Sequence, residues 1–338
     1  MHTIFLLLGG IQVGVTRDLF IHLSQNKLLN TSAKRWGLKL GARSVVAGTT
    51  VKEMIKSVLD LNALGISCTV DNLGEFVYEK EEAIEAKTQI LKVIEAIYEH
   101  DAKAHISLKP TQIGLDIDYD FCLTNLTEIV EAASKHNIFI NVDMEDHAHL
   151  QQTFDLINTV KQKYNNIGTV IQAYLFRAED DIKDFKESRL RIVKGAYKES
   201  EKVAFQNKKE IDQNYLHLIE YHLLHGRFTS IATHNHHVIN HVKQFVKENN
   251  IAMDKFEFQM LYGFRKDMQL QLAKEGYNFC TYVPFGSDWY GYFMRRLAER
   301  PQNLNLVANQ VFNKRVNTII GVCVGALLLG GLLKKTKG

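Results

Sequence analysis

Short apolar runs alternate with longer amphipathic stretches along most of the chain from residue 64 onward. Each run is rich in β-branched or aromatic residues and ends in polar residues or glycine, whereas the longer stretches repeat their apolar positions with a helical period. Eight runs are predicted to be strands: Ile66–Val70, His105–Leu108, Ile138–Val142, Thr169–Tyr174, Arg191–Lys194, Thr229–Thr233, Phe256–Leu261 and Phe279–Pro284. The clearest helices between them are predicted over Glu79–His100 and Asn125–His136.

This alternation predicts an α/β fold of the (β/α)8, TIM-type barrel class. Strands that alternate with helices form a parallel sheet, because parallel neighbours need a crossover connection. Eight units within about 250 residues fit a closed barrel better than an open sheet. Two further helices, Thr16–Gln25 and Thr50–Leu64, are expected before the barrel. The chain is therefore divided into N-terminal helices (1–63), a catalytic barrel (64–315) and an apolar tail (316–338).

The apolar tail changes this picture, because residues 318–333 carry no charge and are followed by three lysines. A helix over these residues would be roughly 24 Å long at ~1.5 Å per residue, which is shorter than the ~30 Å hydrocarbon core of a bilayer. Two interpretations stay open: a buried or dangling apolar segment, and a segment that associates with a membrane.

Charge and cysteine content exclude several classes of protein. The formal net charge of +3 is too small to indicate nucleic-acid binding, and no GxGxxG or P-loop motif follows a predicted strand. The four cysteines are widely spaced, with no CxxC pair and no metal-binding spacing. Free thiols in a reducing compartment are therefore expected. The histidines of THNHH (233–237) lack a metal-binding spacing as well, so no metal site is predicted.

In a barrel of this class, the chemistry lies just beyond the carboxyl ends of the strands. The residues at these positions are DNLGE (71–75), KPTQ (109–112), DMED (143–146), QAY (172–174), KGAY (194–197), THNHH (233–237), QMLYG (259–263) and YVPFG (282–286). They include lysines, carboxylates, histidines, tyrosines and glycines, which a barrel made only for packing does not need.

The helix predicted after the last strand carries a polar stripe. Five residues of Ser287–Arg300 fall within an arc of about 100° on a helical period: Asp288, Tyr292, Arg295, Arg296 and Glu299. Two guanidinium groups that face one way can grip a carboxylate through several charge-assisted hydrogen bonds. The alternative is a solvated helix face with Arg–Glu pairs.

Two lysines at strand ends are further candidates. Lys109 and Asp143 end neighbouring predicted strands, and such a pair either binds a substrate or only seals the barrel mouth. Lys194 lies in RIVKGAY (191–197), where Gly195 permits close approach of the backbone to a ligand. Lys194 could bind a phosphate or a carboxylate, form a Schiff base, or belong to a buried ion pair.

Seven motifs, taken in order, resemble the proline dehydrogenase family over residues 15–315. They are ISLKPTQIGLD, VDMED, VIQAYL, RIVKGAYKE, ATHN, FEFQMLYG and YVPFGSDWYGYFMRRLAERPQN. The combination of RRLxER with RxVKGAY is specific, and the chain is most similar to the compact, single-function bacterial enzymes of the family.

The resemblance implies FAD as cofactor, L-proline as substrate, 1-pyrroline-5-carboxylate as product and a membrane quinone as electron acceptor. It implies that the substrate is bound by Lys109, Leu261, Tyr282, Arg295 and Arg296. It implies catalytic positions for Asp143 and Arg191, at the substrate pocket and the flavin edge. It assigns cofactor contacts to Met144, Gln172, Lys194, Gly195, Ala196, Thr233 and His234, and Glu299 is grouped with them as support for the arginine helix.

Some questions stay open within this resemblance. The basic residue that contacts the FAD phosphates is not obvious, and Lys208 or Lys209 is the expected one. The tail lies outside the family pattern, so a cytoplasmic protein with peripheral membrane contact is expected. 1-Pyrroline-5-carboxylate dehydrogenase is the expected pathway partner. The rival readings are a Schiff-base lyase or aldolase that uses Lys109 or Lys194, and a non-enzymatic amino-acid-binding protein that uses Arg295 and Arg296.

Overall fold

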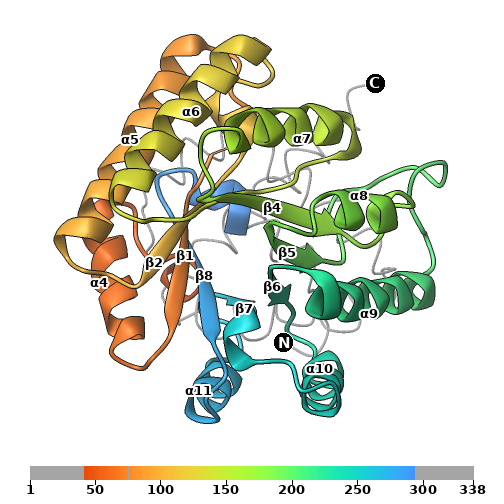
Figure 1. Cartoon of the computed structure of the whole chain (residues 1–338). Helices are drawn as coiled ribbons and strands as arrows, with labels where there is room; N and C mark the ends of the chain where they lie inside the picture. Colours follow the sequence, from red (N-terminus) through yellow and green to blue (C-terminus); the bar gives the residue numbers. More distant parts are fainter. Residues whose placement is uncertain (1–41, 75, 294–338) are drawn as a thin grey trace, which may run out of the picture. The chain divides into compact units, whose positions relative to one another are not determined.

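Eight parallel strands close into a barrel in the order in which they occur in the chain (Figure 1). The computed structural model describes residues 42–74 and 76–293, which include all eight strands. The strands are β1 (Ser67–Asn72), β2 (Ala104–Leu108), β3 (Ile140–Val142), β4 (Ile167–Gln172), β5 (Arg189–Val193), β6 (Phe228–Ala232), β7 (Phe256–Leu261) and β8 (Phe279–Phe285). The predicted (β/α)8 class is confirmed, and the ends of each predicted strand lie within two residues of the observed ends.

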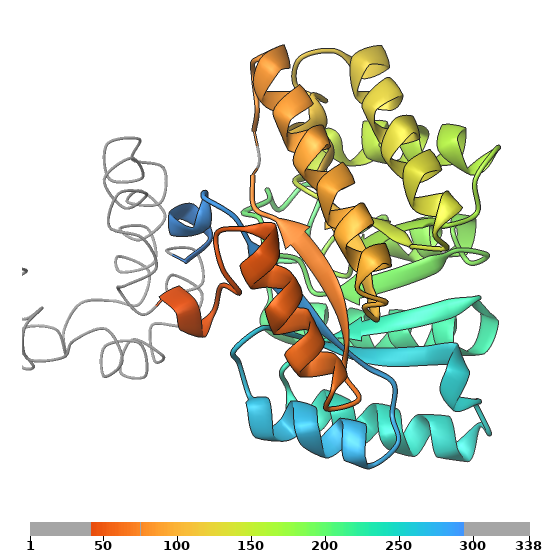
Figure 2. The ribbon, with the colours of Figure 1, turned by 90° about the vertical axis from the view of Figure 1, so that its left-hand side faces the viewer.

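Helices surround the strands on the outside (Figure 1). They are α4 (Val51–Asn62), α5 (Lys80–Glu99), α6 (Tyr119–Lys135), α7 (His147–Lys161), α8 (Ala178–Asp184), α9 (Lys208–His225), α10 (His236–Glu248) and α11 (Lys266–Lys274), with 3-10 helices η3 (Pro110–Ile113) and η4 (Met253–Lys255). A further 3-10 helix, η2 (Ala42–Ser44), belongs to a separate unit. The predicted helix Thr50–Leu64 is α4, which packs with α5 against β1 (Figure 2). Apolar side chains of the strands and helices form one core between the two layers.

Helix α6 begins six residues before the predicted start at Asn125. Asp118 precedes the helix in an extended conformation, and its side chain accepts a hydrogen bond from the backbone N–H of Phe121 at 2.7 Å. This N-cap satisfies a donor that the first helical turn leaves unpaired. The apolar periodicity predicted the interior of α6, but the cap determines where the helix begins.

The described residues belong to two compact units. One unit spans Val45–Ser287 and contains the barrel with α4, and the other includes residues 42–44 and 288–293. The predicted helix Thr16–Gln25 and the apolar tail lie outside the described residues, so the division at residues 63 and 315 stays a prediction. None of the described helices is long and apolar enough to cross a membrane.

The inner face of the barrel is polar. Side chains of a strand alternate between its two faces, so Thr69 and Asp71 of β1 point inward, whereas Cys68 and Val70 belong to the apolar core. Barrels of this class are usually filled by branched apolar side chains. Buried polar side chains destabilise a fold unless each has a hydrogen-bond or charge partner. The partners of these inward-facing side chains therefore indicate whether they are structural or functional.

Two layers of inward-facing side chains matter below. The upper layer lies at the carboxyl ends of the strands and consists of Asp71, Lys109, Asp143, Arg191 and Tyr282. The lower layer lies nearer the amino ends of the strands and consists of His105, Arg189, Glu257 and Cys280. Arg189 and Cys280 are two residues before Arg191 and Tyr282, and His105 is four residues before Lys109.

Candidate active site

The upper layer brings together four side chains that the sequence singled out. Arg191 Nη1 lies 2.5 Å from Asp143 Oδ1, and Lys109 Nζ lies 3.7 Å from Asp143 Oδ2. The hydroxyl of Tyr282 lies 2.8 Å from Asp143 Oδ2. Asp71, at the end of β1, joins them: its Oδ2 lies 3.1 Å from Lys109 Nζ and 2.7 Å from the Tyr282 hydroxyl. Two cations and two carboxyl groups therefore meet at one end of the barrel.

Arg191 is held rigidly in this layer. Its Nε donates to Gln259 at 2.7 Å, Nη1 to Asp143, and Nη2 to Ser107 at 2.8 Å and to Thr69 at 3.3 Å. Its guanidinium carbon also lies 5.2 Å from the centre of the Tyr282 ring, within the range of a cation–π contact. A guanidinium fixed on all sides can present a positive charge at a defined place without reorganisation.

The electrostatics of the layer separate its two carboxyl groups. Burial alone would raise the pKa of Asp143, but the positive charges of Arg191 and Lys109 outweigh it and hold that pKa below its ordinary value. Burial is the main cause that raises the pKa of Asp71; the charge of Lys109 opposes this shift, and the charge of Asp143 adds to it. Burial and both carboxylates raise the pKa of Tyr282 well above its usual range. Asp143 is therefore the anion that pairs with Arg191.

Leu261 lies beside this layer, because it is the register partner of Tyr282 across the β7–β8 pair. Its backbone N–H donates to His234 Nε2 at 3.0 Å. This nitrogen must accept, so the proton of a neutral His234 ring is on Nδ1. The expected substrate residue Leu261 and the expected cofactor residue His234 are thus in direct contact.

Met144 and Gln172 are also neighbours. Gln172 Nε2 lies 3.0 Å from the backbone oxygen of Glu145 and 3.5 Å from that of Met144. Gln172 Oε1 is buried and accepts no hydrogen bond from any described residue. A buried acceptor without a donor is costly, so this oxygen is suited to a ligand that supplies an N–H group.

The Lys194–Ala196 segment forms a second basic region. Lys194 forms an ion pair with Asp212 of α9, and Lys208 reaches the same carboxylate at 2.5 Å. Gly195 has a φ of 111°, and a Cβ at this position would overlap the ring of Tyr174. Ala196 is exposed. The segment therefore packs its glycine against Tyr174 beside two lysines, of which Lys208 was one of the two predicted phosphate contacts.

Thr233 lies directly after β6 (Phe228–Ala232), at the edge of the site. Its backbone N–H donates to the carbonyl oxygen of Gln259 at 3.0 Å, and its hydroxyl accepts from the N–H of Asn235 at 3.1 Å. Asn235 in turn caps α10 by accepting from the N–H of His237. The sequence THNHH thus combines a strand end, a helix cap and the first turn of a helix. The predicted Arg295, Arg296 and Glu299 lie outside the described residues.

The lower layer contains a group of side chains of the metal-binding types. One ligand atom each from His105, Glu257 and Cys280 lies within 4.8 Å of the others. Glu257 Oε1 already accepts from Arg189 at 2.6 Å, from Ser230 at 2.7 Å and from Gln259 at 2.6 Å. The guanidinium of Arg189 thus supplies the positive charge that the buried carboxylate requires.

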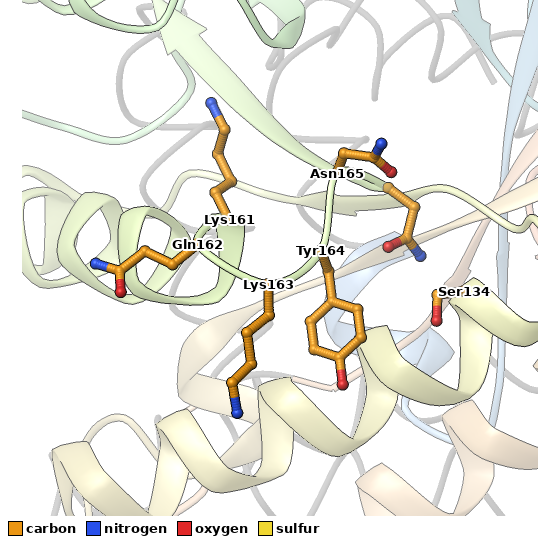
Figure 3. Close-up of a pocket in the computed structure, with 7 residues that line it drawn as sticks. Ser134, Lys161, Gln162, Lys163, Tyr164 and Asn165 are labelled. Atoms are coloured by element: carbon orange, nitrogen blue, oxygen red, sulfur yellow. The ribbon is translucent and has the colours of Figure 1, made fainter.

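A pocket at the other end of the barrel is a weaker candidate. It is lined by Ser134 and residues 161–166, in the connection between α7 and β4 (Figure 3). Its two lysines, Lys161 and Lys163, point to opposite sides of the backbone (Figure 3). Lys161 donates to Ser188 at 2.5 Å. Side chains that diverge do not form a binding site in the way that the upper layer does.

Sequence reasoning missed three residues of the site. Asp71 and Gln259 were present in the strand-end strings DNLGE and QMLYG but were given no role, and Asp212 of α9 was not considered. Gln259 joins the two layers, since it accepts from Arg191 and donates to Glu257. The signal for Asp71 and Gln259 was their inward parity, two residues after Thr69 and Glu257 on the same strands.

Comparison with known proteins agrees with the geometry. The family model described as "Proline dehydrogenase" matches residues 54–309. The chain is 48% identical over 292 residues to "Proline dehydrogenase 2" of Bacillus subtilis (strain 168), covering 86% of this chain and 96% of that protein. It is 40% identical to "Proline dehydrogenase" of Deinococcus radiodurans, covering 81% of this chain and 90% of that protein.

Solved structures share the fold. A crystal structure of proline utilization A from Bdellovibrio bacteriovorus, inactivated by N-propargylglycine, superposes with a TM-score of 0.72 at 22% identity. The match covers 80% of this chain but only 34% of that longer chain. The structural likeness supports the barrel, while the family model and the curated relatives cover most of the sequence. The chain therefore belongs to the proline dehydrogenase family of oxidoreductases.

Proposed function

We propose that the protein oxidises L-proline to 1-pyrroline-5-carboxylate with FAD as hydride acceptor, and that a membrane quinone takes up the electrons. The upper layer carries this proposal, because it offers fixed positive charge from Arg191 and Lys109 beside the aromatic ring of Tyr282 at the carboxyl end of the barrel. An amino acid with a carboxylate and an apolar ring complements such a site.

One feature of the described residues fits a flavin. The buried Oε1 of Gln172 needs a donor such as a ring N–H. Gly195 is a proposed cofactor contact at which a positive φ and close packing on the Tyr174 ring exclude a side chain. Met144, Thr233, His234 and Ala196 complete the proposed cofactor contacts, with Lys194 and Lys208 or Lys209 near the phosphates. Bound FAD would supply the two-electron chemistry, and the protein would supply orientation and charge.

The substrate is proposed to bind through its carboxylate and its ring. Lys109, Arg295 and Arg296 would hold the carboxylate through charge-assisted hydrogen bonds, and Glu299 would support the two arginines. Tyr282 and Leu261 would pack on the pyrrolidine ring. Oxidation requires a neutral amine, because the nitrogen lone pair forms the C=N bond as the adjacent carbon loses its hydride. Anchors on the carboxylate leave the nitrogen free to lose its proton.

Arg191 and Asp143 are proposed to act together. The guanidinium of Arg191 would stabilise negative charge that develops at the flavin edge during oxidation. Asp143 would keep Arg191 in place through the 2.5 Å ion pair and would face the substrate pocket with its second oxygen. Their chemistry requires no metal.

The absorbance spectrum of the purified full-length protein tests this proposal. A flavin band that L-proline bleaches without added dye is the expected result. A protein without flavin, even after reconstitution with FAD, would contradict it. Tyr282 occupies a position at which, by the family resemblance, hydroxyproline-preferring relatives tend to differ. We therefore expect hydroxyproline to be the poorer substrate in the same experiment.

The quinone, the membrane and the pathway are separate parts of the proposal. The uncharged residues 318–333 would hold a cytoplasmic enzyme against the membrane that contains its acceptor, and 1-pyrroline-5-carboxylate dehydrogenase would consume the product. Removal of residues 318–338 followed by cell fractionation tests the anchor. If the truncated protein partitions between membrane and cytosol as the full chain does, the anchor is wrong.

The lyase and binding-protein alternatives are less well supported. Lys194 forms an ion pair with Asp212, and Lys109 lies 3.7 Å from Asp143, so each amine is engaged by a carboxylate and is not placed as a nucleophile. Membership in a family of oxidoreductases argues against a role in binding alone. Borohydride trapping of a substrate on Lys109 or Lys194 would revive the first alternative.

A further inference from the structure

The Tyr282 hydroxyl makes more short contacts with carboxyl groups than its single proton can satisfy. Its oxygen lies 2.7 Å from Asp71 Oδ2 and 2.8 Å from Asp143 Oδ2. A phenol donates one hydrogen bond, and an ionised carboxylate can only accept. Tyr282 keeps its proton, because burial and the neighbouring carboxylates raise its pKa well above the usual range. Two hydrogen bonds along this line therefore require a second proton, which one of the two carboxyl groups must carry.

Asp143 is the carboxyl group that is held ionised. Its Oδ1 accepts from Arg191 at 2.5 Å and from Asn141 Nδ2 at 2.9 Å. Lys109 Nζ adds a second cation, 3.7 Å from Oδ2. A proton on Asp143 would weaken a charge-assisted pair inside the barrel, where such pairs are costly to break. The Oδ2 of Asp143 is thus an acceptor for the Tyr282 hydroxyl.

Asp71 has the surroundings of a neutral acid. It is 1% exposed, and its Oδ1 has no hydrogen-bond partner among the described residues. The charged and titratable groups that face it in the described barrel are Lys109 after β2, Asp143 after β3 and Tyr282 on β8, while Arg191 on β5 acts through Asp143. The charge of Lys109, 3.1 Å from Asp71 Oδ2, favours the anion, but burial and the charge of Asp143 outweigh it and raise the pKa of Asp71. An unpartnered buried oxygen costs less on a neutral carboxyl group than on an anion.

We propose that Asp71 is a positioning residue that stays protonated, donates its proton to the Tyr282 oxygen and so turns the Tyr282 proton toward Asp143. The line then runs from Asp71 as donor, through the Tyr282 hydroxyl, to Asp143 as acceptor. The catalytic consequence of this order rests on the proposed oxidation of L-proline, whereas the position of the proton does not.

A neutral Asp71 gives the upper layer its charge and its shape. With Asp71 protonated, the cations Lys109 and Arg191 face one anion, Asp143, so the layer keeps a positive charge for a substrate carboxylate. With Asp71 ionised, that charge is cancelled, and two anions compete for the one proton of Tyr282. The ring of Tyr282, which we propose as the wall of the pocket, would then lose one of its two anchors. Substrate binding should therefore weaken as the pH rises and Asp71 ionises.

Infrared spectroscopy of the full-length holoenzyme locates the proton directly. The C=O stretch of a protonated carboxyl group absorbs above the amide I band, and at neutral pH most carboxyl groups of a protein are ionised. We expect such a band in the wild-type spectrum, its loss in Asp71→Asn, and its retention in the matched control Asp155→Asn, which changes an exposed residue of α7. Persistence of the band in Asp71→Asn, or its absence from the wild type, would overturn the assignment.

Thermal unfolding gives a second test that does not depend on activity. Asparagine is the uncharged isostere of a protonated aspartate, so Asp71→Asn should melt at or above the wild-type temperature at neutral pH. The folded-state pKa of Asp71 is raised, so this carboxyl group favours the folded wild type at low pH and loses that contribution as the pH rises. The advantage of Asp71→Asn should therefore grow with pH. A variant that unfolds or melts far below the wild type contradicts the proposal.

The pH profile of kcat/KM with L-proline tests the role in catalysis. Asp71→Asn is expected to stay within about threefold of the wild type at neutral pH and to lose part of the alkaline decline, whereas Asp71→Ala should fall at least about tenfold. An equal loss in both variants, with an unchanged profile, would refute the positioning role. A wild type that never oxidises L-proline would refute the proposed function instead, while the infrared and melting results would still decide where the proton lies.

Discussion

Strand β5 contributes an arginine to each layer of the barrel interior, and the two arginines have different surroundings. Arg189 in the lower layer lies 2.6 Å from Glu257, and its guanidinium lies 4.8 Å and 4.6 Å from the ring centres of Phe139 and Phe228. Arg191 in the upper layer lies 2.5 Å from Asp143. Both are arginine–carboxylate pairs, two residues apart on one strand.

The lower pair is complete, whereas the upper pair has groups left over. Glu257 Oε1 takes three donors, and its layer contains one carboxylate for one arginine. The upper layer adds a second carboxyl group, a lysine and a tyrosine to the same kind of pair. The difference suggests that an ion pair inside a barrel is structural when its charges are matched, and becomes a site when further groups compete for them.

Glu257→Gln should break the lower pair and give the largest effect. Removal of one partner leaves Arg189 without its counter-charge, which typically costs about 3–5 kcal/mol of the free energy of unfolding. Urea unfolding measures this loss, and kcat/KM of the folded fraction should stay within about threefold. Glu128→Gln, which removes the exposed partner of Lys87, is the control and should cost no more than ~1 kcal/mol. If kcat/KM of the folded fraction falls well beyond threefold, the lower layer also contributes to activity, and the proposed difference between the layers is wrong.

Arg191→Lys should break the upper pair and, in contrast to Glu257→Gln, lower activity more than stability. Lysine cannot reproduce the fork that contacts Asp143, Gln259 and Ser107 together. We expect kcat/KM for L-proline to fall about 100-fold, equivalent to about 2.7 kcal/mol, with a smaller change in unfolding free energy. Arg189→Lys is the matched control, for which steady-state kinetics should show a change of a few fold at most. Similar kinetic losses in both variants would contradict the comparison.

Gly195→Ala sharpens the comparison, because it tests what lies beyond the upper layer. The added Cβ would overlap the Tyr174 ring at a backbone φ of 111°. We expect the dissociation constant for FAD to rise about tenfold, or about 1.4 kcal/mol, as measured by quenching of flavin fluorescence. Gly276→Ala separates backbone strain from the clash, because its φ is also positive, at 87°, but no atom lies within 4 Å of the added Cβ. Equal weakening in both variants would show that the Gly195 backbone is not at the cofactor.

The stability contributed by the two layers should depend on pH in opposite directions, because the pKa of Asp71 is raised and that of His105 is lowered. This prediction has the smallest expected effect. Burial, followed by the charges of Arg189 and Arg191, lowers the pKa of His105 well below 6.5. The unfolded chain binds this proton first as the pH falls, so the contribution of His105 to stability is present above about pH 6.5 and lost below it. Between neutral pH and about pH 5, the wild type should lose about 1 kcal/mol more than His105→Gln, or roughly 2–4 °C in Tm. Parallel melting curves across this range would contradict the assignment of a neutral His105.

The alternation of short apolar runs with amphipathic helical stretches was sufficient to predict the barrel and which residues lie at its strand ends. The sequence KPTQ placed Lys109 at a strand end, and the structure brings it to 3.7 Å from Asp143 as neighbouring strands require. Asp71 escaped prediction because its partner Tyr282 is 211 residues away, and only closure of the barrel reveals the shared hydroxyl. The start of α6 escaped because a cap, rather than periodicity, determines it.

The ligands were predicted from different evidence than the fold. The strand-end residues predicted an anion-binding mouth, but the choice of L-proline and FAD depended on the family resemblance carried by motifs such as RIVKGAY and RRLAER. Charges alone do not distinguish one carboxylate ligand from another, because arginine and lysine bind them all. The shape of the wall and the position of each proton discriminate among ligands, and both arise from contacts between distant strands.

Closure of the barrel has a consequence in time. Ser67 of β1 donates to the backbone of Phe279 on β8, 212 residues later. At about 5–20 residues per second, a ribosome needs roughly 10–40 s to synthesise that interval. During this time the edge of β1 that pairs with β8 is unpaired, and Asp71 has no hydrogen bond to Tyr282. β8, the last of the described strands to be made, therefore completes both the barrel and the upper layer, and partly synthesised chains depend on protection of the β1 edge until β8 is made.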